Sequence, residues 1–367
     1  MSDRTGGVKL VDYIRWMGGF DFNTYAFREA DALVLCVISY FDLNPVFAGR
    51  KTAYVRECIP MIDAGEAKIC ITGGDMGNTE IFEAAAKSKR FGSLSMTDYE
   101  DIIDQEQSLQ FSAVTFHDED RFSFLAFRGT DSTLTGWKED FMISFTQTLA
   151  QKMSVDYAER VFANDAAKDL YIGGHSKGGN QALYAACMLS DDLWARITRV
   201  FLLDGPGFCP EVLDVSLIKK IDPKAIKIIP EHDIIGKLFE PKITNTIIVE
   251  SYRIGFMQHS LASWLIAYGD LAALPVNDPA SVLISDTITS WVSDIPQEDR
   301  PKFVEELFDA LGAGGKNSLD DMGPEDLWNA LVSFRETSDM TKNTLKDLPH
   351  YLWQEVKNLI GLSESEP

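Results

Sequence analysis

The chain has 367 residues, enough for one large domain or for a domain with a substantial addition. Its 45% hydrophobic and 25% charged residues are ordinary for a globular protein. The formal net charge of -22 argues against nucleic acids and anionic lipid surfaces as partners. The N-terminus shows no apolar signal core, and the longest apolar run, 32–38, is too short to span a bilayer, so we expect a cytoplasmic protein without an integral membrane segment.

The five cysteines are scattered and odd in number, and no pair of them has metal-ligand spacing. We therefore expect reduced core thiols rather than disulfides, and we predict neither a bound metal nor another cofactor. These cysteines are Cys36, Cys58, Cys70, Cys187 and Cys209.

The N-terminal part of the chain is predicted to be helical. Apolar residues recur at helical intervals over 8–17 and 26–41, and the glycines at 18–19 separate these two segments. Asp31 is interpreted as a solvated or capping residue near the start of the second helix. A third helix is predicted over 78–90, with acidic residues early and basic residues late.

From residue 109 the apolar period becomes that of strands. The segments 111–116 and 122–127 predict a hairpin that turns at 117–120. The hairpin ends in the polar segment 128–132. A helix from about 155 to 167 follows.

The segment 169–183 predicts a strand, a sharp turn and a helix. The turn contains the pattern Gly174-x-Ser176-x-Gly178, and an alanine-rich stretch follows it. A serine on such a turn adopts a strained backbone that lifts its hydroxyl above the end of a parallel sheet. The alternative is a glycine-rich loop that binds phosphate or packs tightly.

Three further strands are predicted over 200–203, 225–229 and 246–249. Their alternation with helices predicts an α/β protein of the α/β-hydrolase fold, with a mostly parallel sheet flanked by helices. Functional groups of such a sheet gather at the carboxyl ends of its strands. The polar residues that fall there are Thr130, Ser176, Asp204 and Asp233.

The chain beyond about residue 270 is predicted to be helical over 280–292, 300–311, 324–334 and 344–359. We accordingly divide the sequence into an α/β-hydrolase domain with its helical N-terminal segment (1–270), a helical C-terminal cap (271–360) and a polar tail (361–367). The cap shows no catalytic pattern, and an assembly surface there would be compatible with a homo-oligomer.

The base of the serine site can be chosen among five histidines. His117 lies in the hairpin turn, at the opposite edge of the sheet from the serine, and His350 lies in a C-terminal helix without polar neighbours. His175 and His232 each adjoin a site residue in the sequence and should point away from the nucleophile. His259 remains, in the order serine, aspartate, histidine that α/β-hydrolases use. Its alternative role is a helix cap or a packed core histidine.

The acid has two candidates. Asp233 follows the second strand after the serine, Asp204 follows the first, and either could hold the imidazole in the required tautomer. Asp204 could instead pair with Lys177 or close the turn at 205–207, and Asp233 could instead cap the segment 234–236. The residues favour Asp233 as the acid.

The oxyanion hole requires donors that point at the substrate carbonyl oxygen. One is the backbone N–H of Lys177, and the other is expected from Thr130. The Lys177 side chain could steer an anionic substrate group or form a salt bridge with a nearby carboxylate.

Several blocks of this sequence resemble the class 3 (fungal-type) triacylglycerol lipases, in the same order over residues 109–265. They are Phe127-Arg-Gly-Thr-Asp131, Gly174-His-Ser-Lys-Gly-Gly179, Glu231-His-Asp-Ile-Ile235 and Gln258-His-Ser260. The resemblance implies that Ser176 is the nucleophile, Asp233 the acid, His259 the base and Thr130 the oxyanion residue. It also implies an ion pair between Arg128 and Asp140.

A second resemblance covers almost the whole chain. Blocks such as Gln110-Phe-Ser-Ala113, Gly136-Trp-Lys-Glu-Asp140 and Asp204-Gly-Pro-Gly207 are similar to an uncharacterised bacterial lipase-like family known as a domain of unknown function. That family often carries serine at the position of Asp233, which moves the acid role toward Asp204. Lys177 departs from the class 3 lipases, which have an aliphatic residue there.

These features predict a serine hydrolase that cleaves a small-molecule or lipid-like carboxylic ester through an acyl-enzyme. Two alternatives remain at this stage. One is a non-catalytic binding or scaffold protein that retains the fold, and the other is an acyltransferase that uses the same triad.

Overall fold

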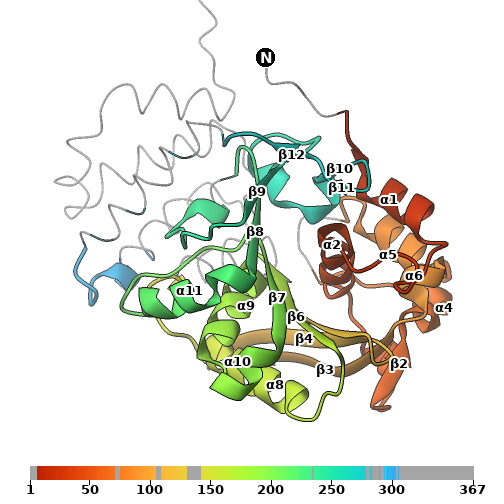
Figure 1. Cartoon of the computed structure of the whole chain (residues 1–367), viewed down its shortest axis with the longest axis horizontal. Coiled ribbons are helices and arrows are strands. Elements are labelled where there is room, and N and C mark those ends of the chain that lie inside the picture. Colours follow the sequence, from red (N-terminus) through yellow and green to blue (C-terminus); the bar gives the residue numbers. More distant parts are fainter. Residues whose placement is uncertain are drawn as a thin grey trace, which may run out of the picture.

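A computed structural model describes residues 6–70, 75–104, 109–129, 142–233, 235–277 and 295–302, with single positions at 282, 289, 293 and 305. Its main sheet has nine strands in the order β12-β9-β8-β7-β6-β5-β4-β3-β2 (Figure 1). The strands are β2 (Thr52–Tyr54), β3 (Ser95–Asp104), β4 (Leu109–Asp118), β5 (Phe122–Phe127), β6 (Asp169–His175), β7 (Ile197–Leu203), β8 (Ala225–Pro230), β9 (Thr246–Val249) and β12 (Ala273–Leu274).

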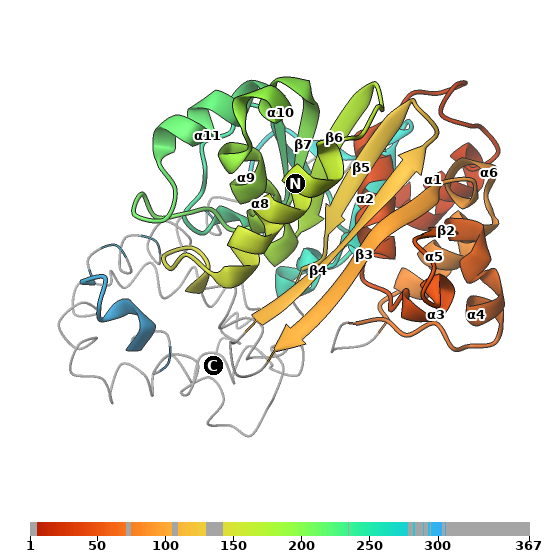
Figure 2. The ribbon, with the colours of Figure 1, turned by 90° about the horizontal axis from the view of Figure 1, so that it is seen from below.

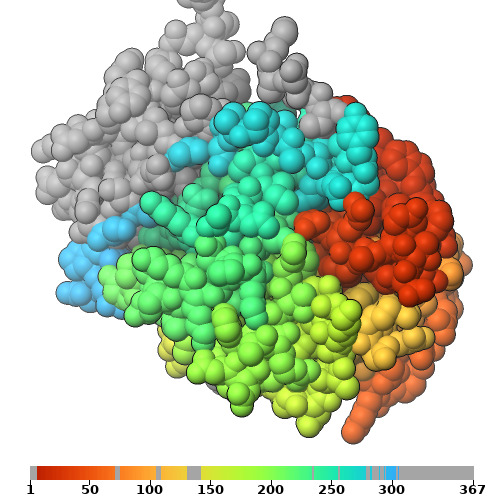
Figure 3. Space-filling model, in the orientation of Figure 1, coloured from red at the N-terminus to blue at the C-terminus, as the bar shows by residue number. Residues whose placement is uncertain are grey.

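The sheet has a parallel half and an antiparallel half. Strands β5 to β9 run parallel to one another, and β2 to β5 pair in antiparallel fashion. A small second sheet contains β1 (Val8–Lys9), β10 (Leu265–Ala267) and β11 (Asp270–Leu271). The pairing of β1 with β10 brings the N-terminal segment beside the chain that follows His259 (Figure 3).

Two groups of helices cover opposite faces of the main sheet (Figure 2). One group is α1 (Leu10–Met17), α2 (Glu29–Ile38), α3 (Asn44–Phe47), α4 (Ile59–Asp63), α5 (Asn78–Lys87) and α6 (Lys89–Gly92). The other is α8 (Leu149–Phe162), α9 (Lys177–Met188), α10 (Asp191–Arg196) and α11 (Val215–Ile221). Short 3₁₀ turns complete the fold: η1 (Val55–Cys58), η2 (Asp222–Lys224), η3 (Ile235–Lys237), η4 (Gly255–His259) and η5 (Leu261–Ser263).

Strand β5 shows why the sheet is covered on both sides. All six of its residues are buried. Phe124 and Ala126 belong to the core formed with the N-terminal helices, and Leu125 and Phe127 belong to the core formed with α8 and α9. Because successive side chains of a strand point to opposite faces, a continuous apolar run of this kind requires helices on both faces. The predicted α/β-hydrolase fold is thereby confirmed.

The boundaries of α8 differ from the predicted 155–167. The helix begins at Leu149 because Thr148 and Gln151 form a reciprocal capping box. The Thr148 side chain accepts from the Gln151 N–H, and the Gln151 side chain accepts from the Thr148 N–H. It ends at Phe162, earlier than expected.

Asp31 is fully buried, so the expectation of a solvated residue was wrong and that of a capping residue was right. Its Oδ2 accepts from the Arg28 N–H at the start of α2. The same carboxylate accepts two hydrogen bonds from Arg90, at 2.8 and 2.6 Å, and one from the Tyr13 hydroxyl at 2.8 Å. This network ties α1, α2 and α6 together.

The main sheet continues past residue 270, because β12 pairs with β9. The helices predicted over 324–334 and 344–359 and the polar tail at 361–367 lie outside the described residues, as do most positions of the helices at 280–292 and 300–311. In the part of the chain that the structure describes, no helix combines the length and apolar character needed to cross a membrane.

Candidate active site

Ser176 lies on the predicted sharp turn, between the end of β6 and the start of α9. Its backbone angles are φ 58° and ψ −126°, values that non-glycine residues rarely adopt. The turn is held by the sheet on one side and by the helix on the other. The Ser176 N–H donates to the Leu203 carbonyl at 2.9 Å, and the Ser176 carbonyl accepts from the Gly179 N–H at 2.9 Å. Surrounding structure therefore maintains the strain at this residue.

The glycines of the turn are required by close backbone contacts. A Cβ on Gly174 would lie 2.2 Å from the Gly178 carbonyl oxygen, and one on Gly178 would lie 2.1 Å from the Phe127 carbonyl oxygen. Gly129 also lies close to Ser176, because a Cβ on Gly129 would be 3.1 Å from the Ser176 Cβ. The serine is thus enclosed by segments that leave no room for larger residues.

His259 makes hydrogen bonds with both Ser176 and Asp204. Its Nε2 lies 2.9 Å from the Ser176 Oγ, and its Nδ1 lies 2.8 Å from the Asp204 Oδ2. The three side chains come from the end of β6, the end of β7 and η4. A carboxylate accepts the Nδ1–H, which leaves Nε2 free to accept the serine proton.

Asp233 was the preferred acid on the sequence, but the structure places Asp204 in hydrogen-bonding contact with the imidazole. The nearest Asp233 oxygen, Oδ1, lies 3.9 Å from the His259 Nδ1. Its Oδ2 accepts from the Gly236 N–H at 3.2 Å, which is the local capping role considered as an alternative. Asp204 directly follows β7 with a left-handed φ of 49°. Both carboxyl groups thus stand beside the imidazole.

The two acids are buried together, and this changes the protonation of Asp204. Asp204 and Asp233 have exposed fractions of 0% and 1%. Burial, followed by the nearby charge of Asp233, raises the pKa of Asp204 to about 7, although the hydrogen bond from His259 acts in the opposite direction.

His175, at the end of β6, contacts the backbone of His259. Its Nε2 lies 2.8 Å from the His259 carbonyl oxygen, which can only accept, so Nε2 carries the hydrogen. Its Nδ1 lies 2.7 Å from the Tyr40 hydroxyl. Burial, together with the neighbouring His259, lowers the pKa of His175 well below its usual value. The ring is therefore neutral, and Nδ1 accepts from Tyr40.

The loop that carries His259 is held by Gln258. The Gln258 carbonyl accepts from the Trp264 indole N–H at 2.8 Å, and its side-chain carbonyl accepts from the His232 backbone N–H at 3.0 Å. The turn after β8 and the η4 loop are thereby joined. Sequence reasoning recognised neither this contact nor Tyr40.

Of the histidines farther from Ser176, His117 lies where expected and His350 is outside the described residues. His117 is hydrogen-bonded to the side chains of Thr97 and Ser123, at 2.8 Å each, in the antiparallel half of the sheet. His350 is outside the described part of the chain.

Only one of the two expected oxyanion donors lies among the described residues. The Lys177 N–H stands at the N-terminus of α9, directly after the nucleophile, whereas Thr130 lies outside the described residues. The Lys177 side chain is buried, and its Nζ donates to the Gln110 Oε1 at 3.2 Å. Arg128 forms an ion pair with Asp101, and its expected partner Asp140 lies outside the described residues.

Asp204, Asp233 and His259 also form the one cluster of described side chains compact enough to be considered for a metal ion, with ligand atoms within 4.8 Å of one another. Both imidazole nitrogens of His259 are already hydrogen-bonded, to Asp204 and Ser176. We therefore assign no metal to this cluster.

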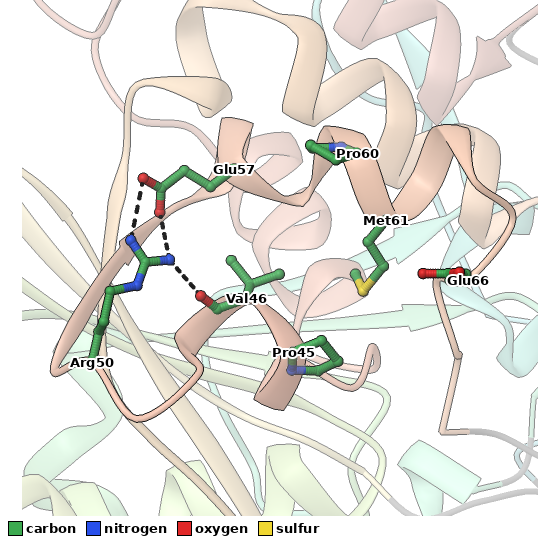
Figure 4. Close-up of a pocket in the computed structure, with 7 residues that line it drawn as sticks. All are labelled: Pro45, Val46, Arg50, Glu57, Pro60, Met61 and Glu66. Carbon is green, nitrogen blue, oxygen red and sulfur yellow. Dashed lines mark hydrogen bonds and ion pairs between the residues drawn. The ribbon is translucent and has the colours of Figure 1, made fainter.

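A separate pocket of about 320 Å³ lies among the N-terminal helices (Figure 4). Its polar residues include Arg50 and Glu57, which form an ion pair at 3.1 Å. It contains no residue of the serine site. The pocket therefore has no evident part in the chemistry of Ser176.

Together, the fold and the site define a protein of the α/β-hydrolase class with a lipase-like domain. The chain belongs to the Mbeg1-like family, whose model matches residues 85–309. Among solved structures, the chain is similar to one described as the crystal structure of M37 lipase, with a TM-score of 0.36 and 13% sequence identity, over 57% of this chain and 70% of that chain. No curated protein matches it.

Proposed function

We propose that this protein is a serine hydrolase that cleaves a carboxylic ester by way of an acyl-enzyme. The observation that supports this proposal most strongly is the hydrogen-bonded chain from Asp204 through His259 to Ser176. It occurs at a serine with a strained backbone and an adjoining helix N-terminus. A histidine that only packs in the core would require neither a strained backbone at Ser176 nor a hydrogen bond to its hydroxyl.

In the first half of the reaction, the Ser176 Oγ attacks the carbonyl carbon of the ester. The His259 Nε2 takes the hydroxyl proton as the Oγ–C bond forms. The resulting imidazolium keeps its Nδ1–H directed at Asp204. His259 then gives the proton to the departing alcohol oxygen, and the C–O bond of the ester breaks.

In the second half, water replaces the alcohol. His259 takes a proton from the water as its oxygen attacks the acyl carbon, and then returns that proton to the Ser176 Oγ as the acid is released. The negative charge on the carbonyl oxygen is stabilised by the Lys177 N–H, and we assign the second donor to Thr130. Each such donor contributes about 3 kcal/mol to the transition state.

The proposed substrates are esters with a lipid-like acyl group. Ile254 is 78% exposed and lies on the same loop as His259, and Tyr268 is fully exposed after β10. Exposed apolar residues on the chain segments that flank His259 favour an apolar substrate over a charged one. The net charge of -22 likewise disfavours anionic substrates.

The proposal is tested with aryl esters of increasing acyl length, assayed on the wild type and on Ser176→Ala. We expect hydrolysis by the wild type and its loss in the variant. Ser190→Ala removes an exposed serine outside the site and is the matched control, with unchanged activity. A folded wild type that hydrolyses none of the esters and is not labelled by a fluorophosphonate probe would contradict the proposal and favour the binding-protein alternative. Transfer of the acyl group to an added alcohol in preference to water would favour the acyltransferase.

A further inference from the structure

The two acids beside His259 each have one oxygen without a donor. Among the described residues, no N–H or O–H group is hydrogen-bonded to the Oδ1 atom of Asp204 or of Asp233. The other oxygens are satisfied, because the Asp204 Oδ2 contacts His259 and the Asp233 Oδ2 accepts from the Gly236 N–H. Two buried acceptors without donors would be costly for the folded state.

The two carboxyl groups lie close together at His259. One oxygen of each lies within 4.8 Å of the other and of a ring nitrogen of His259, and the Asp204 Oδ2 and the Asp233 Oδ1 lie 2.8 and 3.9 Å from the His259 Nδ1. Gly236 closes the space beside them, since a Cβ there would lie 2.2 Å from the Asp204 Oδ1. A bridging proton would supply the missing donor for both oxygens without any further group.

The surrounding cations are engaged elsewhere. The Lys237 Nζ donates to the carbonyls of Glu231 and Asp233, at 2.8 and 2.7 Å. Lys227, on β8, pairs with Glu240 at 2.6 Å. Its charge acts on Asp204 only at a distance.

The neighbouring imidazole of His175 adds no positive charge to compensate the acids. Its ring lies against that of His259, with ring centroids 4.6 Å apart and an interplanar angle of 39°, and it is held neutral by burial. Two full negative charges beside His259 would therefore remain poorly compensated in this buried region.

We propose that Asp204 and Asp233 share one proton between their Oδ1 atoms, so that the pair carries a single negative charge, and that Asp233 is a positioning residue of the triad. This inference rests on the proposed function, because it assigns the acid role to the pair. Burial and the charge of Asp233 raise the pKa of Asp204, in agreement with the geometry.

The shared proton leaves the carboxyl pair with the single negative charge that the reaction requires. When His259 takes the serine proton it gains one positive charge, and the singly charged pair balances it. The bridge also fixes the orientation of the Asp204 carboxyl group, since it joins a side chain in contact with the imidazole to one anchored on the η3 turn. Asp233 thus acts on the base through Asp204.

The first test measures the free energy of unfolding against pH for the wild type, Asp233→Asn, Asp204→Asn and the control Asp118→Asn, which changes a buried aspartate of β4. An unfolded aspartate releases its proton near pH 4, whereas the folded pair would hold it to about pH 7. As the pH rises through this window, the free energy of unfolding of the wild type should therefore fall relative to that of both site variants. The change per pH unit should correspond to the release of about one proton. Asp118→Asn should run parallel to the wild type.

The second test compares esterase activity at pH 6. Asp233→Asn supplies an amide N–H to the Asp204 Oδ1 in place of the proton, and we expect a loss of about threefold. Asp233→Ala supplies no donor and should lose more than tenfold. Asp204→Asn favours the wrong imidazole tautomer and should lose about 10⁴-fold.

Two outcomes would overturn the inference. One is a wild-type stability curve parallel to those of Asp233→Asn and Asp204→Asn between pH 4 and 7. The other is an Asp233→Asn activity as low as that of Asp204→Asn, which would make Asp233 a direct partner of the imidazole. The stability test does not depend on catalysis, so an inactive protein would contradict the proposed function and leave the shared proton to be decided by the stability curves.

Discussion

The two halves of the sheet contribute to the site in different ways. The parallel half, β5 to β9, brings the serine, the base and both acids to the carboxyl ends of its strands. The antiparallel strands β2 to β4 contribute no proposed triad residue. The N-terminal helices act on the site from one face of the sheet: α2 leads to Tyr40, whose hydroxyl contacts His175, and His175 contacts the carbonyl of His259. The proposed triad thus comes from the parallel strands and the loops after them, and the N-terminal helices hold it in place. Substitutions in the triad should therefore affect mainly activity, and substitutions within the N-terminal helices mainly stability.

The largest expected effect is on the parallel half. His259→Ala removes the group that takes the serine proton, so kcat/KM for an aryl ester should fall by about 10⁴-fold or more. The free energy of unfolding should change little in comparison. His232→Ala is the matched control, because its side chain lies beside Glu231 rather than Ser176, and it should retain activity. Equal losses in the two variants would contradict the assignment of the base.

The next largest effect is on the stability of the N-terminal helices. Arg90→Met leaves the fully buried Asp31 without its cation, and we expect the free energy of unfolding to fall by about 3–5 kcal/mol in urea titrations. Esterase activity measured well below the unfolding midpoint should remain close to that of the wild type. The double variant Arg90→Met with Asp31→Asn should recover part of the loss. A fall of less than about 1 kcal/mol in the single variant would show that the ion pair does not hold these helices together.

A smaller effect is expected where the N-terminal helices meet the site. Tyr40→Phe removes the donor to the His175 Nδ1 and leaves the ring in place, so kcat should fall by about tenfold with little change in KM. Tyr54→Phe, at an exposed position on β2, is the control and should have no effect. Unchanged kcat in Tyr40→Phe would show that the N-terminal helices do not position the base.

The smallest effect is expected at the surface of the N-terminal helices. Arg15 pairs with Glu80 at 2.7 Å, but both side chains are more than half exposed. Arg15→Ala should lower the free energy of unfolding by less than about 1 kcal/mol, because exposed ion pairs are screened by water and salt. A loss comparable to that of Arg90→Met would mean that burial does not distinguish the two pairs.

Local patterns predicted the parts of the site that local geometry determines. The Gly174-x-Ser176-x-Gly178 turn appeared in the sequence because close backbone contacts require its glycines. His259 emerged by elimination from only five histidines. Both inferences depended on the rule that functional groups gather at the carboxyl ends of parallel strands.

Other features had no local signal. The position of Asp204 against the imidazole depends on its left-handed backbone, and nothing in the residues distinguished it from Asp233. Tyr40 reaches the site from a distant helix, so its role depends on tertiary packing alone. Strand β3 was not predicted because it is rich in acidic residues and mostly half-buried, and it interrupts its pairing with β4 at a bulge between Thr97 and Glu100.

The central claim is that the Ser176 hydroxyl is a nucleophile activated by His259. Incubation with a fluorophosphonate followed by peptide mapping in a mass spectrometer tests it most directly. The account predicts a single phosphonyl adduct on the peptide that contains Ser176, formed far more slowly in His259→Ala. A folded wild type without an adduct, or an adduct formed equally fast without the imidazole, would contradict it.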